Sequence, residues 1–238
     1  MPDFHELWPG GPVFAQAENQ RLGTDSVLLS AFVPPRPGRK GIDLGCGSGA
    51  LALLLLARES QLDMTGLELD ESAAALAQAN LAQNGLAGRS RVVIGDIRTH
   101  RELFRAGSFD LAVANPPYFP VGSGALAPMP ARAAARSEMN CSLEELCAAA
   151  AWLLQSGGRF CVVHKPERLS ELFVTMTAHT LEPKRLRLVS RDGESAPSLA
   201  LVEGRRGGRP GLRIEAPLLL TGSDGGESEE LRRICHRP

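Results

Sequence analysis

The chain of 238 residues is 43% hydrophobic, so it can bury a full core, and its length suits one α/β domain with additions. Its net charge of −1 argues against strong nonspecific affinity for nucleic acid. The five cysteines show no C-x-x-C spacing, no apolar stretch reaches ~18 residues, and the N-terminus lacks the pattern of a signal peptide. We therefore expect a cytoplasmic protein with reduced thiols and no membrane span.

Strand-like and helix-like runs alternate through the middle of the chain. The predicted strands are residues 41–44, 64–69, 91–94, 109–114 and 159–164, and the predicted helices are residues 50–57, 71–84, 143–154 and 167–179. Strands separated by helices of this length imply parallel pairing with right-handed crossovers.

The alternation stops after Pro183, where residues 184–189 and 199–203 are strand-like with no helix between them. We expect an antiparallel hairpin there, with residues 212–215 as an additional edge strand. The sequence thus predicts an α/β fold with a doubly wound, mostly parallel seven-stranded sheet that ends in an antiparallel hairpin. We expect residues 1–238 to form one domain. Its parts are an N-terminal cap (1–39), a core (40–205) and an edge strand with a tail (206–238).

A glycine-rich loop, Asp43-Leu-Gly45-Cys-Gly47-Ser-Gly49, follows the first strand and opens a helix. Its glycines let a ligand approach the backbone closely, and the helix N-terminus is electropositive. The spacing is G-x-G-x-G, which differs from the G-x-G-x-x-G fingerprint of dinucleotide-binding folds. The loop therefore predicts a ligand site, although a glycine loop alone is weak evidence.

Two further acids end neighbouring strands. Glu68 lies 25 residues after Asp43, where a carboxylate can hold both hydroxyls of a ribose, and Asp96 is placed to receive the amino group of an adenine ring. Either acid alone could be a solvated strand end. The carboxyl ends of strands in an open α/β sheet line one crevice, so we expect these acids to share one nucleoside site.

The fourth strand ends in Asn115-Pro116-Pro117-Tyr118. The Asn115 side-chain oxygen and the Pro116 carbonyl can each accept a hydrogen bond from an exocyclic NH2 group, and the prolines hold the turn rigid. Tyr118 can stack on the planar group that carries the nitrogen. The combination predicts methylation of a planar nitrogen. The alternative is a strand that simply stops at prolines, since Asn-Pro is a common turn dipeptide.

In this order, the motifs resemble those of class I S-adenosylmethionine-dependent methyltransferases, over residues 20–205. The resemblance implies a Rossmann-like fold, S-adenosylmethionine as the cofactor, and catalysis by Asn115, Pro116, Pro117 and Tyr118. It also implies that Thr24 and Asp25 help to close over the cofactor. The expected cofactor-binding residues are Thr24, Asp25, Asp43, Gly45, Gly47, Gly49, Glu68, Leu69, Asp96, Ile97 and Asn115. No metal site is expected, because the histidines are dispersed.

More narrowly, residues 21–25, 135–138, 157–160 and 163–169 are similar to the family that methylates N6 of the adenine 3′ to the anticodon of a valine tRNA. The similarity implies an RNA partner, with tRNA1(Val) as the expected substrate. Methylation of a glutamine in a translation factor is an alternative, but that class usually has a helical N-terminal domain, and only residues 1–39 precede the first strand here. Methylation of an exocyclic amine in rRNA or DNA is another. A catalytically idle nucleoside- or NAD-binding module is a third, which the G-x-G-x-G spacing and Asn115 oppose.

Several features stay open at this point. Trp8 and Phe14 can stack on RNA or pack internally, and His164 can face the substrate or be structural. The basic clusters at 184–187, 205–209 and 232–233 can meet phosphates or be ordinary solvated charge. Residues 119–136 form a long connection rich in Gly, Ala and Pro, which predicts a lid that orders when substrate binds.

Overall fold

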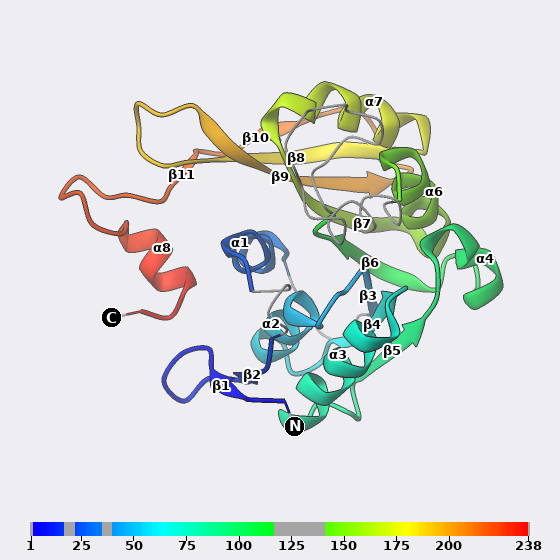
Figure 1. The fold of residues 1–238 in the computed structure, drawn as a ribbon. Coiled ribbons are helices and arrows are strands. Elements are labelled where there is room, and N and C mark those ends of the chain that lie inside the picture. The colour runs from blue at the N-terminus through cyan, green and yellow to red at the C-terminus, as the bar shows by residue number, and fades with distance from the viewer. Residues whose placement is uncertain (1, 17–21, 35–39, 117–140, 238) are drawn as a thin grey trace, which may run out of the picture.

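One large sheet organises the protein, which is seen here as a computed structural model describing residues 2–16, 22–34, 40–116 and 141–237 (Figure 1). Its strand order is β10-β8-β9-β7-β6-β3-β4-β5, and β11 pairs with β8 beside β10. The strands are β3 (Lys40–Leu44), β4 (Asp63–Glu68), β5 (Ser90–Ile94), β6 (Phe109–Ala114), β7 (Leu154–His164), β8 (Leu181–Ser190), β9 (Pro197–Arg206), β10 (Arg213–Ile214) and β11 (Leu218–Leu219). A separate hairpin joins β1 (His5–Glu6) to β2 (Val13–Phe14).

The pairing confirms the predicted doubly wound sheet. Strands β7, β6, β3, β4 and β5 run parallel to one another, whereas β9 is antiparallel to both β7 and β8. The seven long strands β3 to β9 correspond to the seven predicted ones. Two short strands, β10 and β11, extend the sheet by pairing in parallel with β8, so the predicted edge strand at residues 212–215 is reduced to two paired residues.

Helices cover both faces of the sheet (Figure 1). They are α1 (Thr24–Phe32), α2 (Ala50–Arg58), α3 (Glu71–Gln83), α4 (His100–Leu103), α6 (Leu143–Leu153), α7 (Leu169–Ala178) and α8 (Glu229–Ile234), with 3-10 turns η1 (Ile97–Thr99) and η2 (Pro166–Arg168). Alternate β6 residues point to opposite faces. Val113 packs in the core that includes α1 and α2, and Ala112 packs in the core that includes α6 and α7. The helices between the strands therefore lie as the alternating sequence pattern predicts.

Two asparagines attach the N-terminal hairpin to α3. Asn80 is fully buried, and its side chain accepts from the N–H of Ala15 at 2.7 Å and donates to the carbonyl oxygens of Ala15 and Ser48, both at 2.9 Å. Asn84 accepts from Val13 N–H at 2.9 Å and donates to its carbonyl oxygen at 2.7 Å. A buried amide that lost these partners would be costly, so the hairpin, α3 and the loop at Ser48 are held as one unit.

Two arginines hold the C-terminal end of α1. Arg58, from α2, donates to the carbonyl oxygens of Ser30 and Val33. Arg185, from β8, donates to the carbonyl oxygen of Phe32 at 2.6 Å, and its guanidinium lies 4.0 Å from the centre of the Phe32 ring. Carbonyl groups at a helix end lack intrahelical partners, so these contacts fix α1 against both α2 and the hairpin β8–β9.

No helix in the described part of the chain has the length and apolarity needed to cross a membrane.

Candidate functional site

The predicted cofactor residues gather at one edge of the sheet. Strands β6, β3, β4 and β5 are neighbours and run parallel, so their carboxyl ends meet there. Asn115 directly follows β6, Gly45 follows β3 and Gly95 follows β5, and β4 ends at Glu68. Backbone hydrogen bonds tie the exits together, from Gly45 N–H to Leu67 O at 2.9 Å and from Gly95 N–H to Glu68 O at 2.8 Å. Four successive strand ends therefore lie together at the edge where a crevice is expected.

The glycine loop adopts backbone conformations that favour glycine. Gly47 has φ of +53° and Gly49, which precedes α2, has φ of +81°. A side chain at Gly49 would also crowd α3, because a Cβ there would lie 3.0 Å from the Cβ of Ala77. The tight loop thus leads directly into the electropositive start of α2, which suits a ligand with anionic or polar groups. The N–H groups of Gly47 and Gly49 themselves already have acceptors within the protein.

Asp43 lies fully inside this edge, on β3. Its side chain is 2% exposed, and its Oδ2 atom has no hydrogen-bond partner among the described residues. Burial, and then the nearby negative charge of Glu68, raise the pKa of Asp43 from 3.8 to about 7, whereas the N–H of Ala52 opposes the shift. An unsatisfied buried carboxyl oxygen beside a second carboxylate favours a cationic ligand, which would stabilise the ionised form. S-adenosylmethionine is such a ligand, so the residues fit it.

Glu68, at the end of β4, links the glycine loop to the start of α3. Its Oε2 accepts from Gly47 N–H at 2.7 Å, and its Oε1 accepts from Asp70 N–H at 3.0 Å. Each carboxylate oxygen has a second lone pair, so Glu68 can still receive two hydroxyl groups. The next residue, Leu69, is 37% exposed, which leaves an apolar surface beside the carboxylate. This arrangement suits a sugar and its attached ring.

Asp96 is placed at the expected strand end, but its carboxylate is already engaged. It caps η1 by accepting from Arg98 N–H at 2.8 Å, and it forms a two-pronged ion pair with the Arg98 guanidinium. These bonds hold the pKa of Asp96 below its usual range. Ile97 is half-buried against the core on the α6 side of the sheet. Binding of an adenine amino group by Asp96 stays a prediction, and it would have to occur beside Arg98.

Asn115 follows β6 directly and contacts α1. Its Nδ2 donates to the Oγ atom of Ser26 at 3.0 Å, although 89 residues separate the two in sequence. Both side chains are half-buried, as is Pro116. Pro117 and Tyr118 lie outside the described residues, as does the predicted lid at 119–136. Asn115 is thus brought to the same edge as the glycine loop.

Thr24 and Asp25 form the first turn of α1, adjacent to Ser26. Thr24 is exposed and Asp25 is half-buried. The expectation that they help to enclose the cofactor stays a prediction. Their position on the helix that touches Asn115 is consistent with it.

Two residues of this site were missed by sequence reasoning. Ser26 gave no signal of its own, because a serine in an apolar helix is common. Asn80 did leave one: it lies four residues from Asn84 in an alanine-rich helix, on the face that carries Ala73 and Ala77. An asparagine at a core position of a helix requires hydrogen-bond partners from elsewhere in the chain.

The aromatic residues and the histidine left open by the sequence have internal contacts. The ring of Trp8 stacks on His236 with centroids 4.1 Å apart, and Phe14 is buried in the core. His164 is 1% exposed, its Nδ1 accepts from Lys165 N–H at 2.8 Å, and burial lowers its pKa. These contacts favour a structural role for all three.

The basic residues near the C-terminus are held largely within the molecule. Arg185 Nε lies 3.0 Å from Glu203 Oε2, and Arg187 forms a two-pronged ion pair with Glu230 at 2.8 Å. Arg206 donates to a backbone carbonyl oxygen at the start of β7. These guanidinium groups stabilise the fold, and phosphate binding by this part of the chain stays a prediction.

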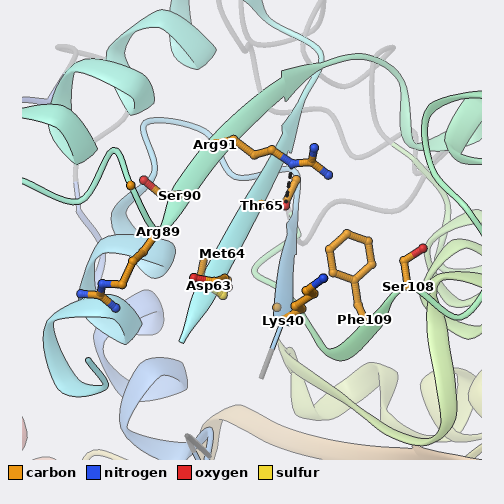
Figure 2. Close-up of a pocket in the computed structure, with 11 residues that line it drawn as sticks. Lys40, Asp63, Met64, Thr65, Arg89, Ser90, Arg91, Ser108 and Phe109 are labelled. Atoms are coloured by element: carbon orange, nitrogen blue, oxygen red, sulfur yellow. Dashed lines mark hydrogen bonds between the residues drawn. The ribbon is translucent and has the colours of Figure 1, made fainter. Parts of the chain in front are cut away.

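A cavity of about 360 Å³ lies at the opposite edge, where β3, β4, β5 and β6 begin (Figure 2). Arg91 Nε donates to Thr65 Oγ1 at 3.2 Å, and Arg89 donates to the carbonyl oxygens of Glu59 and Leu62. These cations are engaged in holding the strand starts. None of the described cofactor residues lines this cavity, so it is separate from the candidate site.

Within the described part of the chain, no three His, Cys, Asp or Glu side chains are grouped as metal ligands would be.

Comparisons with known proteins found similar sequences and similar structures. The model of the methyltransferase small domain family matches residues 11–178. A protein of Tolumonas auensis named tRNA1(Val) (adenine(37)-N6)-methyltransferase is 33% identical over 211 residues, which cover 88% of this chain and 86% of the relative. A protein of Porphyromonas gingivalis with the same name is 35% identical over 78% of this chain and 74% of its own length.

A solved structure described as a predicted O-methyltransferase of Agrobacterium tumefaciens superposes with a TM-score of 0.71 at 20% identity. The alignment covers 89% of this chain and 95% of that one. At this level of identity the likeness shows the fold.

Proposed function

The chain belongs to the methyltransferase small domain family, and from this premise we propose that it transfers a methyl group from S-adenosylmethionine to N6 of an adenine in tRNA1(Val). One observation carries the proposal. Asn115 lies at the end of β6, on the same edge as the glycine loop and the ribose acid Glu68, so an amine acceptor and a nucleoside cofactor can meet there. The choice of tRNA as the substrate is supported by the names of the relatives, and a tRNA substrate implies a reaction in the cytoplasm.

Residues 1–238 are proposed to act as one methyltransferase domain in this reaction. The glycine loop and the buried carboxyl of Asp43 hold the cofactor, while Glu68 receives the two ribose hydroxyls and Leu69 contacts the attached ring. When bound, S-adenosylmethionine supplies a methyl group that its sulfonium already activates. The protein therefore has mainly to place the acceptor nitrogen in line with that methyl.

The acceptor nitrogen needs help because its lone pair is delocalised into the adenine ring. The Asn115 Oδ1 and Pro116 carbonyl oxygens accept its two N–H bonds, which favours a more tetrahedral nitrogen and stabilises the positive charge that develops on it. These two oxygens would hold the nitrogen in place while its lone pair takes the methyl group and the sulfur keeps the electrons of the broken bond. The extra proton on nitrogen then leaves to solvent, so no strong base is required. Tyr118, outside the described residues, is proposed to stack on the base after it leaves its own stack.

The test incubates wild-type protein and labelled S-adenosylmethionine with a cell extract that contains RNA, DNA and protein, then separates the three fractions and locates the label by mass spectrometry of nucleosides and of amino acids. We expect N6-methyladenosine in tRNA, and loss of about 10²–10³ in turnover for Asn115→Ala with cofactor affinity retained, as for removal of one preorganised polar group. Label on protein glutamine alone would refute the RNA assignment and favour a translation-factor substrate. Label in rRNA or DNA alone would keep the chemistry and overturn the tRNA assignment.

A further inference from the structure

The contact between Ser26 and Asn115 joins the start of α1 to the end of β6. Asn115 Nδ2 donates to Ser26 Oγ at 3.0 Å, and both residues are half-buried. Ser26 is the third residue of α1, directly after Thr24 and Asp25. No sequence motif assigns it a role.

A carboxamide has two unlike ends. Its oxygen accepts hydrogen bonds, whereas its nitrogen only donates them. An acceptor amine that meets the oxygen gains a hydrogen bond, but an amine that meets the nitrogen of a flipped amide faces a second donor. A serine hydroxyl can accept from an amide nitrogen or donate to an amide oxygen. In this structure Ser26 accepts from the nitrogen of Asn115, so the oxygen is directed away from Ser26.

We propose that Ser26 is a positioning residue, which fixes the amide of Asn115 with its oxygen toward the acceptor amine. This inference rests on the proposed function, because it concerns the same Asn115. Ser26 acts through Asn115 and is not itself in contact with the reacting atoms.

Contacts at the other end of α1 and along its buried side restrict the movement of Ser26. Arg58 and Arg185 hold the carbonyl groups at the other end of the helix. Its buried residues Leu28 and Leu29 are 0% exposed. A hydroxyl on a helix that is held at one end and packed along one side can restrict the rotation of Asn115, which a water molecule in the same place could not do.

The test compares Ser26→Ala with Ser26→Thr, which keeps the hydroxyl. Ser30→Ala is the matched control, because Ser30 is on the same helix but its Oγ donates to Val27 O at 2.7 Å. We expect Ser26→Ala to lower kcat about tenfold, equivalent to one net hydrogen bond, with unchanged affinity for S-adenosylhomocysteine by calorimetry. Ser26→Thr should restore most of kcat, and Ser30→Ala should leave it unchanged.

A second readout does not depend on turnover. In protein labelled with 15N-asparagine, the side-chain amide of Asn115 can be assigned by its loss in Asn115→Ala. Its protons should exchange with solvent faster in Ser26→Ala than in Ser26→Thr. Equal exchange in both variants would overturn the positioning role.

The double variant Ser26→Ala/Asn115→Ala distinguishes a failure of the positioning role of Ser26 from a failure of the proposed function of Asn115. If Ser26 acts through Asn115, Ser26→Ala should cause no further loss of single-turnover rate when Asn115 is already alanine. If Asn115→Ala retains full activity, the proposed function of Asn115 fails and the inference fails with it. If Asn115→Ala is inactive but Ser26→Ala is fully active, only the inference fails.

Discussion

Replacement of Asn80 by alanine tests whether the N-terminal hairpin supports the glycine loop. The side chain makes three hydrogen bonds in a fully buried position, two to Ala15 and one to Ser48. At about 1 kcal/mol net for each bond, the loss is about 3 kcal/mol. A chain of this size loses about 2 °C in Tm for each kcal/mol, so we expect Tm to fall by about 6 °C.

The bond to Ser48 gives Asn80→Ala a second effect. Ser48 lies in the glycine loop, so the loop should lose the hydrogen bond that holds it to α3. We expect it to bind S-adenosylhomocysteine about tenfold more weakly, a change of about 1.4 kcal/mol in binding free energy. Asn84→Ala is the matched control, because Asn84 also makes three hydrogen bonds, to Val13 twice and to the Asn80 carbonyl oxygen. None of these hydrogen bonds involves the glycine loop.

The assay pairs thermal unfolding with calorimetry of S-adenosylhomocysteine binding. Asn84→Ala should lower Tm but leave the affinity as in the wild type. The reasoning is refuted if Asn80→Ala and Asn84→Ala bind the ligand equally well, because the hairpin would then be attached to α3 without supporting the loop. A Tm change below about 2 °C in Asn80→Ala would refute the hydrogen-bond estimate.

Three other changes probe the same edge of the sheet. Glu68→Ala should weaken cofactor binding by about 1–3 kcal/mol, because the N–H of Gly47 loses its acceptor; unchanged affinity in calorimetry would remove Glu68 from the site. The raised pKa of Asp43, about 7 in the folded protein against 3.8 normally, means that the folded state keeps a proton which the unfolded chain releases. The contribution of Asp43 to the stability of the cofactor-free protein should therefore be greatest below pH 3.8 and should fall as the pH rises through about 7. Denaturant unfolding across that range should show the loss in the wild type and not in Asp43→Asn, and equal pH profiles would contradict the assignment. Gly66→Ala should weaken cofactor binding, since a Cβ would lie 2.6 Å from the Cys46 sulfur in the glycine loop; a variant with wild-type affinity would show that Cys46 can move aside.

Much of the fold was predictable because the core strands and helices are long and periodic. The run at 109–114 coincides with β6, and the helix at 143–154 differs from α6 by one residue. The hairpin β8–β9 extends beyond its predicted ends. Short elements were missed, since β1, β2 and β11 contain two residues each and depend on tertiary contacts that no local pattern announces.

The candidate site was predictable at positions where a residue of suitable chemistry lies at the carboxyl end of a strand. Asp43, Glu68 and Asn115 each follow or end an apolar run, and parallel strands bring such positions to one edge. The contacts of Ser26 with Asn115 and of Asn80 with Ser48 were not predictable, because they join segments 89 and 32 residues apart. Their existence depends on how α1 and α3 pack, which the order of elements does not specify.

Because Arg185 attaches α1 to β8, the hairpin β8–β9 helps to support the candidate site. Arg159 on β7 pairs with Glu203 on β9, Glu203 pairs with Arg185 on β8, and Arg185 reaches the carbonyl oxygen of Phe32. A graft of the alternating strands and helices alone onto another scaffold would leave behind the strand that supports α1. This enzyme could therefore not exchange or lose the hairpin without also rebuilding the helix that contacts Asn115.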